Sequence, residues 1–184
     1  PYWYDVNDNK KTWTNKQIVQ RSCGKFRREW ETSSMKEKSY TPENYPILRY
    51  GDVLLMLAEA ENEAHQGPTD LAYKCINEIR QRAGISKLKG LSYTDFQQAV
   101  RDERARELCF ESLRKYDLVR WGIYVEAVHD KLGAATQDKR WATGNQFIGA
   151  RDYAARTQEK HQFLPIPTKE LDVNGKLEQN KYWQ

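Results

Sequence analysis

Apolar residues are densest between Arg49 and Ala64, where the chain reads RYGDVLLMLAEAENEA. Val53 to Ala58 form an unbroken apolar run, most residues of the stretch are strong helix formers, and no proline interrupts them. Apolar side chains at helical spacing then cover most of the girth of the helix, and such a helix is buried between neighbours. The run is too short to span a bilayer. The pattern predicts a central core helix over residues 50–65.

Two further helices are predicted after a turn at Gly67-Pro68-Thr69. The first covers residues 70–83, because apolar residues recur there at i, i+3, i+4, i+7 and i+11: Ala72, Cys75, Ile76, Ile79 and Ala83. Thr94 and Gln97 then resemble a capping box, which predicts another helix from about Asp95 to Glu111.

A fourth helix is expected over residues 113–121, broken at Gly122, with a weaker helix over 124–132. Two consecutive helix–turn–helix pairs favour helical-repeat packing, in which each pair buries a face that it cannot bury alone. The predicted fold class is therefore all-α, with paired helices, although the spacing between the pairs exceeds a standard tetratricopeptide period.

Helical periodicity is absent from the ends of the chain. Residues 1–45 form an irregular, aromatic-rich segment, and residues 46–184 form the helical domain. Within this domain, residues 133–162 are expected to be a long loop, because aromatic residues return there among Gly, Thr, Asn and Gln. The tail around Pro165-Ile166-Pro167 is expected to be an extended apolar plug, followed by a short turn capped at Thr168.

The composition is that of one domain, or of part of a larger protein, with 184 residues, of which 30% are charged. The net charge of +4 is too small and too diffuse to indicate a nucleic-acid partner. Three cysteines have no metal-ligand spacing, and Cys75 and Cys109 are predicted to be reduced, buried thiols. Because the chain begins at Pro1 and not at a methionine, we treat it as a piece of a longer protein.

Glu103, Glu107 and Glu111 share one helical face with arginines interleaved among them. A pair of carboxylates is also what a glycoside hydrolase requires. A general acid needs a raised pKa, however, and neighbouring arginines keep a carboxylate ionised. The pattern favours a structural ion-pair network, and no catalytic residue is assigned.

The three histidines, His65, His129 and His161, are far apart and have no acidic or cysteine partner at ligand spacing. They are expected to be solvated or to cap helices. No phosphate-binding loop or nucleophile motif is present, so no metal and no cofactor is predicted.

Aromatic clusters are the positive indication of a ligand. The C–H face of a sugar ring packs flat on Trp or Tyr, and its hydroxyl groups need polar partners at the rim. The candidate ligand-binding residues are Trp3, Tyr4, Trp13, Trp141 and Asn145. For each of these residues, packing of a loop onto the helices is the alternative, because Tyr and Trp do this well.

Four motifs in order resemble the C-terminal part of the SusD/RagB family and span roughly residues 45–182: RYGDVLLMLAEAENEA, INEIRQRAG, RDERARELCFESLRKYDLVRWG, and FLPIPTKEL followed by QN. The resemblance implies an all-α fold with tetratricopeptide-like helical pairs and long loops. It also implies a non-catalytic nutrient-binding protein, lipid-anchored and exposed on the outer membrane, that captures glycans or other oligomers. It implies a SusC-like TonB-dependent transporter as partner, and a membrane attachment only through an N-terminal lipid absent from this chain. The ligand aromatics of the family lie in variable loops, so no site residue is transferred.

Two positions depart from the family pattern. Gly51 stands where the family usually has Ala, which should weaken the helix, and Ser112 stands where Gly is usual, so a left-handed turn there would be strained.

Two other function classes remain open. One is a helical-repeat adaptor that binds a partner peptide, and the other is a glycan hydrolase.

Overall fold

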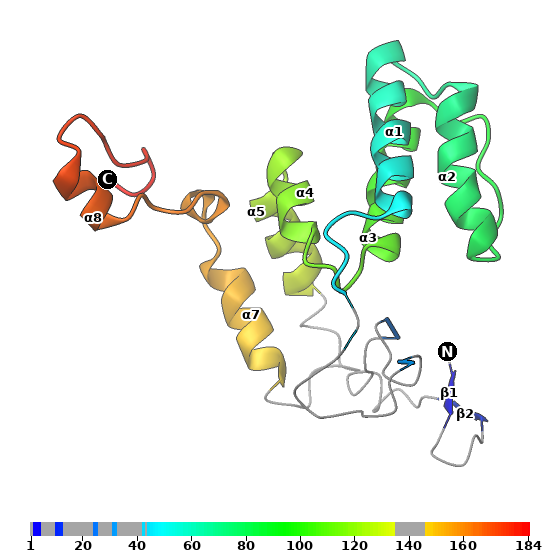
Figure 1. The fold of residues 1–184 in the computed structure, drawn as a ribbon, viewed down its shortest axis with the longest axis horizontal. Coiled ribbons are helices and arrows are strands. Elements are labelled where there is room, and N and C mark those ends of the chain that lie inside the picture. Colours follow the sequence, from blue (N-terminus) through cyan, green and yellow to red (C-terminus); the bar gives the residue numbers. More distant parts are fainter. Residues whose placement is uncertain are drawn as a thin grey trace. The chain divides into compact units, whose positions relative to one another are not determined.

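The computed structural model describes residues 2–4, 10–12, 24–25, 31–32, 42, 44–134 and 146–184, and in these the fold is mainly helical, as predicted (Figure 1). The chain divides into two compact units. The helical-hairpin unit comprises residues 23–114, and the pocket unit comprises residues 1–22 and 115–184. The boundary expected after residue 45 lies inside the helical-hairpin unit.

Three helices build the helical-hairpin unit: α1 (Tyr50–His65), α2 (Asp70–Arg82) and α3 (Tyr93–Glu107). Helix α1 packs against both α2 and α3. The core consists of Leu54, Leu55, Ala58, Ala72, Cys75, Ile76, Ile79, Phe96 and Val100. The predicted stripe on α2 is therefore the buried face of that helix, except for Ala83, which lies in the C-cap and is exposed.

Helix α1 is less enclosed than its sequence predicts. One face is buried, but Tyr50, Val53, Met56 and Leu57 on the other face are 66%, 40%, 42% and 38% exposed. The expectation of a helix buried on nearly all sides is wrong for this unit, because α2 and α3 cover only one side of α1 among the described residues.

The helix starts follow local capping chemistry. Thr69 accepts a hydrogen bond from the Ala72 backbone N–H at 3.1 Å and so begins α2 at the predicted turn. Helix α3 is capped by Ser92, whose hydroxyl accepts from the Asp95 N–H at 3.2 Å. The predicted Thr94 cap is wrong by two residues. Ser, like Thr, is a strong cap, and Ser92 reaches the N–H three residues on.

Helix α3 ends at Glu107, four residues before its predicted end. In the turns that follow, Phe110 and Ser112 have φ angles of 64° and 60°, which confirms the strained left-handed backbone expected at Ser112. Cys109 lies in these turns and is exposed, so the prediction that it is buried is wrong. Burial of Cys75 is confirmed.

The pocket unit consists of short elements: a two-stranded antiparallel ribbon, helices and single helical turns. They are β1 (Tyr2–Tyr4), β2 (Lys10–Thr12), α4 (Arg114–Arg120), α5 (Tyr124–Ala127), the π-helical η3 (Val128–Leu132), α7 (Gln146–Arg156), the 3₁₀ turn η4 (Glu159–Gln162) and α8 (Thr168–Val173).

Helix α7 and η4 lie within residues 133–162, so the expectation of one long loop there is wrong. Ala154 of α7 is buried with Leu118, Tyr124 and Val128, and this tertiary packing supports the helix.

The tail is held by side-chain amides. Gln179 accepts from the Ile166 N–H and donates to the Ile166 carbonyl, both at 2.9 Å, and so pairs the extended segment as a strand would. Asn180 donates to the Leu164 carbonyl at 2.7 Å. Helix α8 begins after Pro167 without a side-chain cap, so the cap predicted at Thr168 is wrong. Proline suits such a start because it fixes φ near the helical value.

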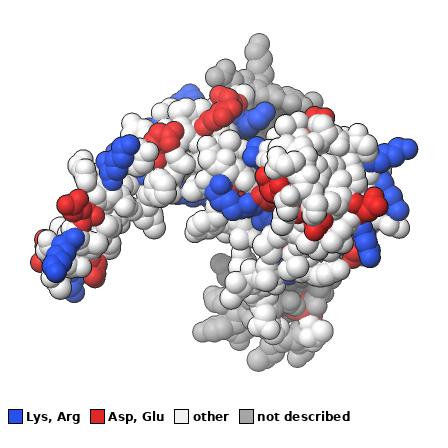
Figure 2. Space-filling view, turned by 90° about the horizontal axis from the view of Figure 1, so that it is seen from above, with Lys and Arg blue, Asp and Glu red and all other residues white. Residues whose placement is uncertain are grey.

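No helix among the described residues is long and apolar enough to cross a membrane. On the face seen in Figure 2, Lys and Arg side chains are interspersed with Asp and Glu side chains among the described residues. The small net charge is therefore spread out on that face and not gathered in one basic patch.

Candidate functional site

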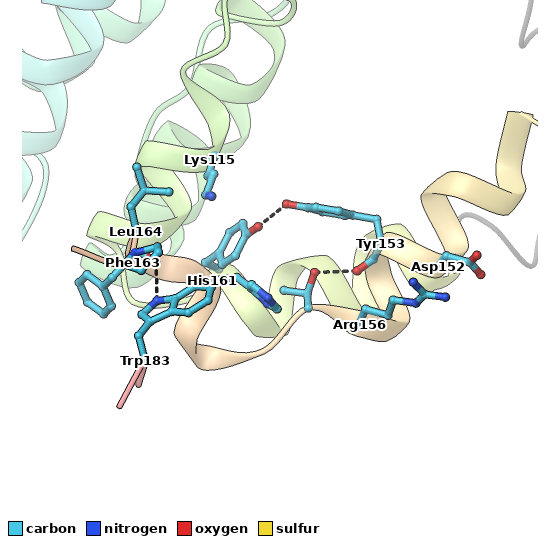
Figure 3. Close-up of a pocket in the computed structure, with 11 residues that line it drawn as sticks. Lys115, Asp152, Tyr153, Arg156, His161, Phe163, Leu164 and Trp183 are labelled. Atoms are coloured by element: carbon cyan, nitrogen blue, oxygen red, sulfur yellow. Dashed lines mark hydrogen bonds between the residues drawn. The ribbon is translucent and has the colours of Figure 1, made fainter. Parts of the chain in front are cut away.

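The pocket unit contains a pocket of about 440 Å³ (Figure 3). Six lining residues are aromatic or apolar: Tyr124, Tyr153, Phe163, Leu164, Pro165 and Trp183. Five carry polar or charged groups: Lys115, Asp152, Arg156, Thr157 and His161. The volume and the mixture of aromatic walls with a few polar groups are typical of small-molecule sites.

Two tyrosines join helices α5 and α7 at the pocket. The hydroxyl groups of Tyr124 and Tyr153 form a hydrogen bond (Figure 3). Burial, followed by this hydrogen bond, raises the pKa of Tyr124 to about 12, so its hydroxyl stays protonated at neutral pH. Tyr124 is 2% exposed, whereas Tyr153 is 49% exposed and can present its ring to a ligand.

The tail positions a tryptophan at the pocket. The Trp183 indole N–H donates to the carbonyls of Lys160 and Phe163 at 3.0 and 3.1 Å, which orients the ring. His161 meets Trp183 edge to face, with ring centroids 6.1 Å apart. The Nδ1 atom of His161 accepts from the Gln158 backbone N–H at 2.8 Å, so a neutral ring carries its proton on Nε2.

The charged groups of the pocket come from helices α4 and α7. Lys115 Nζ lies 5.4 Å from the centroid of the Tyr124 ring, within range of a cation–π interaction. Asp152 Oδ1 lies 3.9 Å from Arg151 Nε, an exposed and weak pair. Thr157 is 4% exposed, and its hydroxyl donates to the Tyr153 carbonyl at 2.7 Å.

The charged motif that could suggest a hydrolase forms a separate cluster in the helical-hairpin unit. Arg49 donates to Glu111 through Nε at 2.7 Å and Nη2 at 2.9 Å, and to Glu107 Oε1 through Nη1 at 2.5 Å. Lys25 also pairs with Glu111, and Arg82 with Glu107. The side chains of Glu107 and Glu111 are only 9% and 5% exposed. The network predicted from the sequence is confirmed.

Two further acidic side chains of this unit, Glu103 and Asp52, form ion pairs between helices. Glu103 accepts from Arg80 of α2 at 2.7 Å, and Asp52 of α1 accepts from Arg104 of α3 at 2.8 Å. Burial acts to raise the pKa of both Glu107 and Glu111, but hydrogen bonds from Arg49 and the neighbouring cations outweigh it, so each pKa lies below its ordinary value. Such carboxylates are poor general acids, and their geometry is that of a helix-joining network.

Gly51 has a structural role in this network. A Cβ atom at this position would lie 2.8 Å from Arg49 Nη1 and 2.9 Å from Glu107 Oε1. The glycine therefore leaves room for the Arg49–Glu107 ion pair against the first turn of α1. The ion pair that fits beside Gly51 offsets the lower helix propensity of glycine at this position.

The histidines behave as predicted. His65 and His129 interact with the backbone carbonyls of Glu61 and Thr157, and His161 takes part in a capping box with Gln158. Among the residues that the structure describes, no group of three or more His, Cys, Asp or Glu side chains could hold a metal ion.

The predicted ligand-binding residues stay predictions. Trp3 and Tyr4 lie in β1, of which only the backbone is described, and Trp13, Trp141 and Asn145 lie outside the described residues. The structure brings together a different set of aromatics at the pocket. Tyr153 is one of the aromatic residues of the 133–162 segment, but no local pattern connects it with Trp183 at the far end of the chain.

Comparison with known proteins places the chain in one family. The sequence model of the SusD family matches residues 1–183. SusD-like protein P25 of Formosa agariphila is 41% identical over 139 residues, which are 73% of this chain and 23% of that protein. SusD-like protein P2 of the same organism is 28% identical over 148 residues, which are 74% of this chain and 25% of that protein.

Solved structures agree with this placement. The crystal structure of a SusD homolog from Bacteroides thetaiotaomicron superposes with a TM-score of 0.67 at 37% identity, and covers 83% of this chain and 30% of that one. A SusD superfamily protein from Bacteroides vulgatus gives a TM-score of 0.57 at 30% identity, and covers 79% of this chain and 28% of that one. The chain thus spans about a quarter of the length of the curated relatives it matches. Its motifs, its helical fold and these matches together show that the chain belongs to the SusD family.

Proposed function

We propose that the protein binds glycans or other nutrient oligomers at the outer-membrane surface, without altering them, and delivers them to a SusC-like TonB-dependent transporter. The family membership over residues 1–183 carries this proposal. It is the function that the resemblance implies, and it includes attachment to the membrane by an N-terminal lipid outside this chain.

The pocket is the proposed ligand site within this chain. Tyr153 and Trp183 offer aromatic surfaces of the kind on which a sugar ring packs, and polar groups of α4, α7 and η4 also line the pocket. Trp3, Tyr4, Trp13, Trp141 and Asn145 remain proposed ligand contacts on the sequence pattern alone.

The binding function is favoured over hydrolysis by the state of the carboxylates. Glu107 and Glu111 each have a lowered pKa and accept hydrogen bonds from cations, whereas a hydrolase needs one protonated carboxyl group at neutral pH. A peptide-binding adaptor remains the second candidate, because α1 presents the apolar side chains of Tyr50, Val53, Met56 and Leu57 at the surface.

A glycan array probed with the full-length protein tests the proposal, followed by calorimetry on any glycan that binds. We expect binding, with the glycan recovered at its original length after overnight incubation. Tyr153→Ala should weaken binding about fivefold, because one aromatic contact contributes about 1 kcal/mol. Tyr116→Ala is the matched control, because Tyr116 is 71% exposed on α4 and does not line the pocket.

Three outcomes would count against parts of the proposal. Shortened glycan would indicate a hydrolase. Binding of apolar peptides without binding of any glycan would favour the adaptor. Binding that is lost in Trp3→Ala, Trp13→Ala or Trp141→Ala but retained in Tyr153→Ala would move the site from the pocket to the aromatic loops.

A further inference from the structure

We infer that the pocket takes a sugar ring that carries an anionic substituent, either a carboxylate or a sulfate ester. The ring would pack on the aromatic wall, and the anion would face the hydrogen-bond donors. This inference rests on the proposed function and adds the ligand class.

Several polar groups of the pocket offer hydrogen-bond donors to a ligand. Nε2 of His161 is a donor, because Nδ1 already accepts from the Gln158 backbone N–H. Tyr124 and Tyr153 have two O–H groups between them but share a single hydrogen bond, so one proton is left for a ligand. The hydroxyl of Thr157 already donates to a backbone carbonyl, so it offers a ligand only its acceptor oxygen.

The charges of the pocket point the same way. Lys115 and Arg156 line the pocket, and neither forms an ion pair with any described residue. Asp152 is the single carboxylate among the described lining residues, and Arg151 lies beside it. Lys160 Nζ adds a further positive charge 5.1 Å from the centroid of the Trp183 ring. The surroundings are therefore net positive, and a ligand that supplies only hydroxyl groups would leave these donors incompletely used.

The apolar walls restrict the anion to one that is attached to a ring. Phe163, Leu164 and Trp183 come from the tail segment, and Tyr124 and Tyr153 come from the helices (Figure 3). A small inorganic anion makes no use of such surfaces, whereas a sugar acid uses both its C–H face and its charge.

Matched pairs of oligosaccharides test the inference in calorimetry with the full-length protein. One pair is a galacturonate tetramer and its fully methyl-esterified form, and the other is a sulfated carrageenan tetrasaccharide and its desulfated form. We expect the carboxylate or the sulfate member to bind at least about fivefold more tightly than its neutral counterpart, and less tightly as salt is added. The two pairs separate a carboxylate ligand from a sulfate ligand.

Charge-removing variants locate the effect. Lys115→Gln and Arg156→Gln should each reduce the affinity for the anionic sugar about fivefold and leave the neutral form unaffected. Lys131→Gln is the control, because Lys131 is exposed on η3 and does not line the pocket.

Failure of the inference and failure of the proposed function give different results. Equal or tighter binding of the neutral members, or of neutral glycans on an array, would overturn the inference and leave the function standing. Absence of binding to every acidic and neutral glycan would overturn both. A loss of anionic affinity in Lys131→Gln equal to that in Lys115→Gln would show a diffuse charge effect and overturn the pocket assignment.

Discussion

At the scale of single residues, Glu107 decides whether the charged motif is a scaffold or a site. Its carboxylate accepts hydrogen bonds from Arg49 and Arg82, and its side chain is 9% exposed. Glu107→Ala removes one partner of a buried pair, which typically costs about 3–5 kcal/mol. We expect the free energy of unfolding to fall by about 3 kcal/mol, because Glu111 still neutralises Arg49. Urea unfolding followed by circular dichroism measures this.

Glu78→Ala provides the comparison, since Glu78 is exposed on α2 and should change stability by less than about 0.5 kcal/mol. If Glu107→Ala left the stability unchanged but abolished binding or cleavage of a glycan, the ion-pair network would be part of a functional site and not a structural network.

The same carboxylates predict a dependence of stability on pH. The pKa values of Glu107 and Glu111 lie below the ordinary 4.5, because the cation partners outweigh burial. The folded state therefore binds fewer protons than the unfolded state, and the stabilisation is fully present above pH 4.5. It is lost as the pH falls through the two folded pKa values. Thermal unfolding from pH 7 to pH 3 should show this loss.

A Glu107→Gln, Glu111→Gln double variant identifies the groups responsible. It should be less stable at neutral pH and show a shallower decline on acidification. An equally steep decline in the double variant would assign the acid sensitivity to other carboxylates.

The cysteines show how a residue-level prediction depends on where a helix ends. Cys75 is 3% exposed, and burial raises the pKa of its thiol, whereas Cys109 is exposed beyond the end of α3. A maleimide should therefore label Cys109 in the native protein and Cys75 only after denaturation, as read by peptide mass spectrometry. Rapid native labelling of Cys75 would contradict the packing of α2 on α1. Cys23 lies outside the described residues and is replaced by Ser in this experiment.

At the scale of elements, the turn after α3 combines buried charge with backbone strain. Ser112 has a φ angle of 60°, in the left-handed region that favours glycine. Ser112→Gly should raise the free energy of unfolding by about 0.5–1 kcal/mol through relief of this strain. Chemical denaturation measures the change. Ser86→Gly, at an exposed position between α2 and α3, is the control and should not raise the free energy of unfolding. If Ser112→Gly lowered the free energy of unfolding, the interactions of the serine side chain would stabilise the fold by more than the left-handed backbone destabilises it.

Elements with a strong local pattern were predictable from the sequence. Helices α1 and α2 start where expected, because an apolar run and a Thr cap at residue 69 are local signals. Helix α7 was missed because Gly149 interrupts a short, mixed sequence in which Ala154 is a buried residue. Tertiary packing, which no local pattern records, supports that helix.

At the scale of the whole molecule, the family was predictable and the pocket was not. Four motifs in order identify the SusD family, and the family match spans residues 1–183. The pocket needs Lys115, Tyr153 and Trp183 from three distant parts of the chain. The pocket depends on helix α7 and on the hydrogen bonds between the Gln179 side chain and the Ile166 backbone. The sequence predicts neither of these.

We propose a ligand site at the pocket that helices α5 and α7 and the tail line. Hydrogen–deuterium exchange of the full-length protein, with and without a saturating glycan that binds, tests it directly. Slower exchange on binding should appear in peptides that cover residues 150–166 and 179–184, with no change over α2. Protection confined to peptides outside those two ranges would contradict the claim.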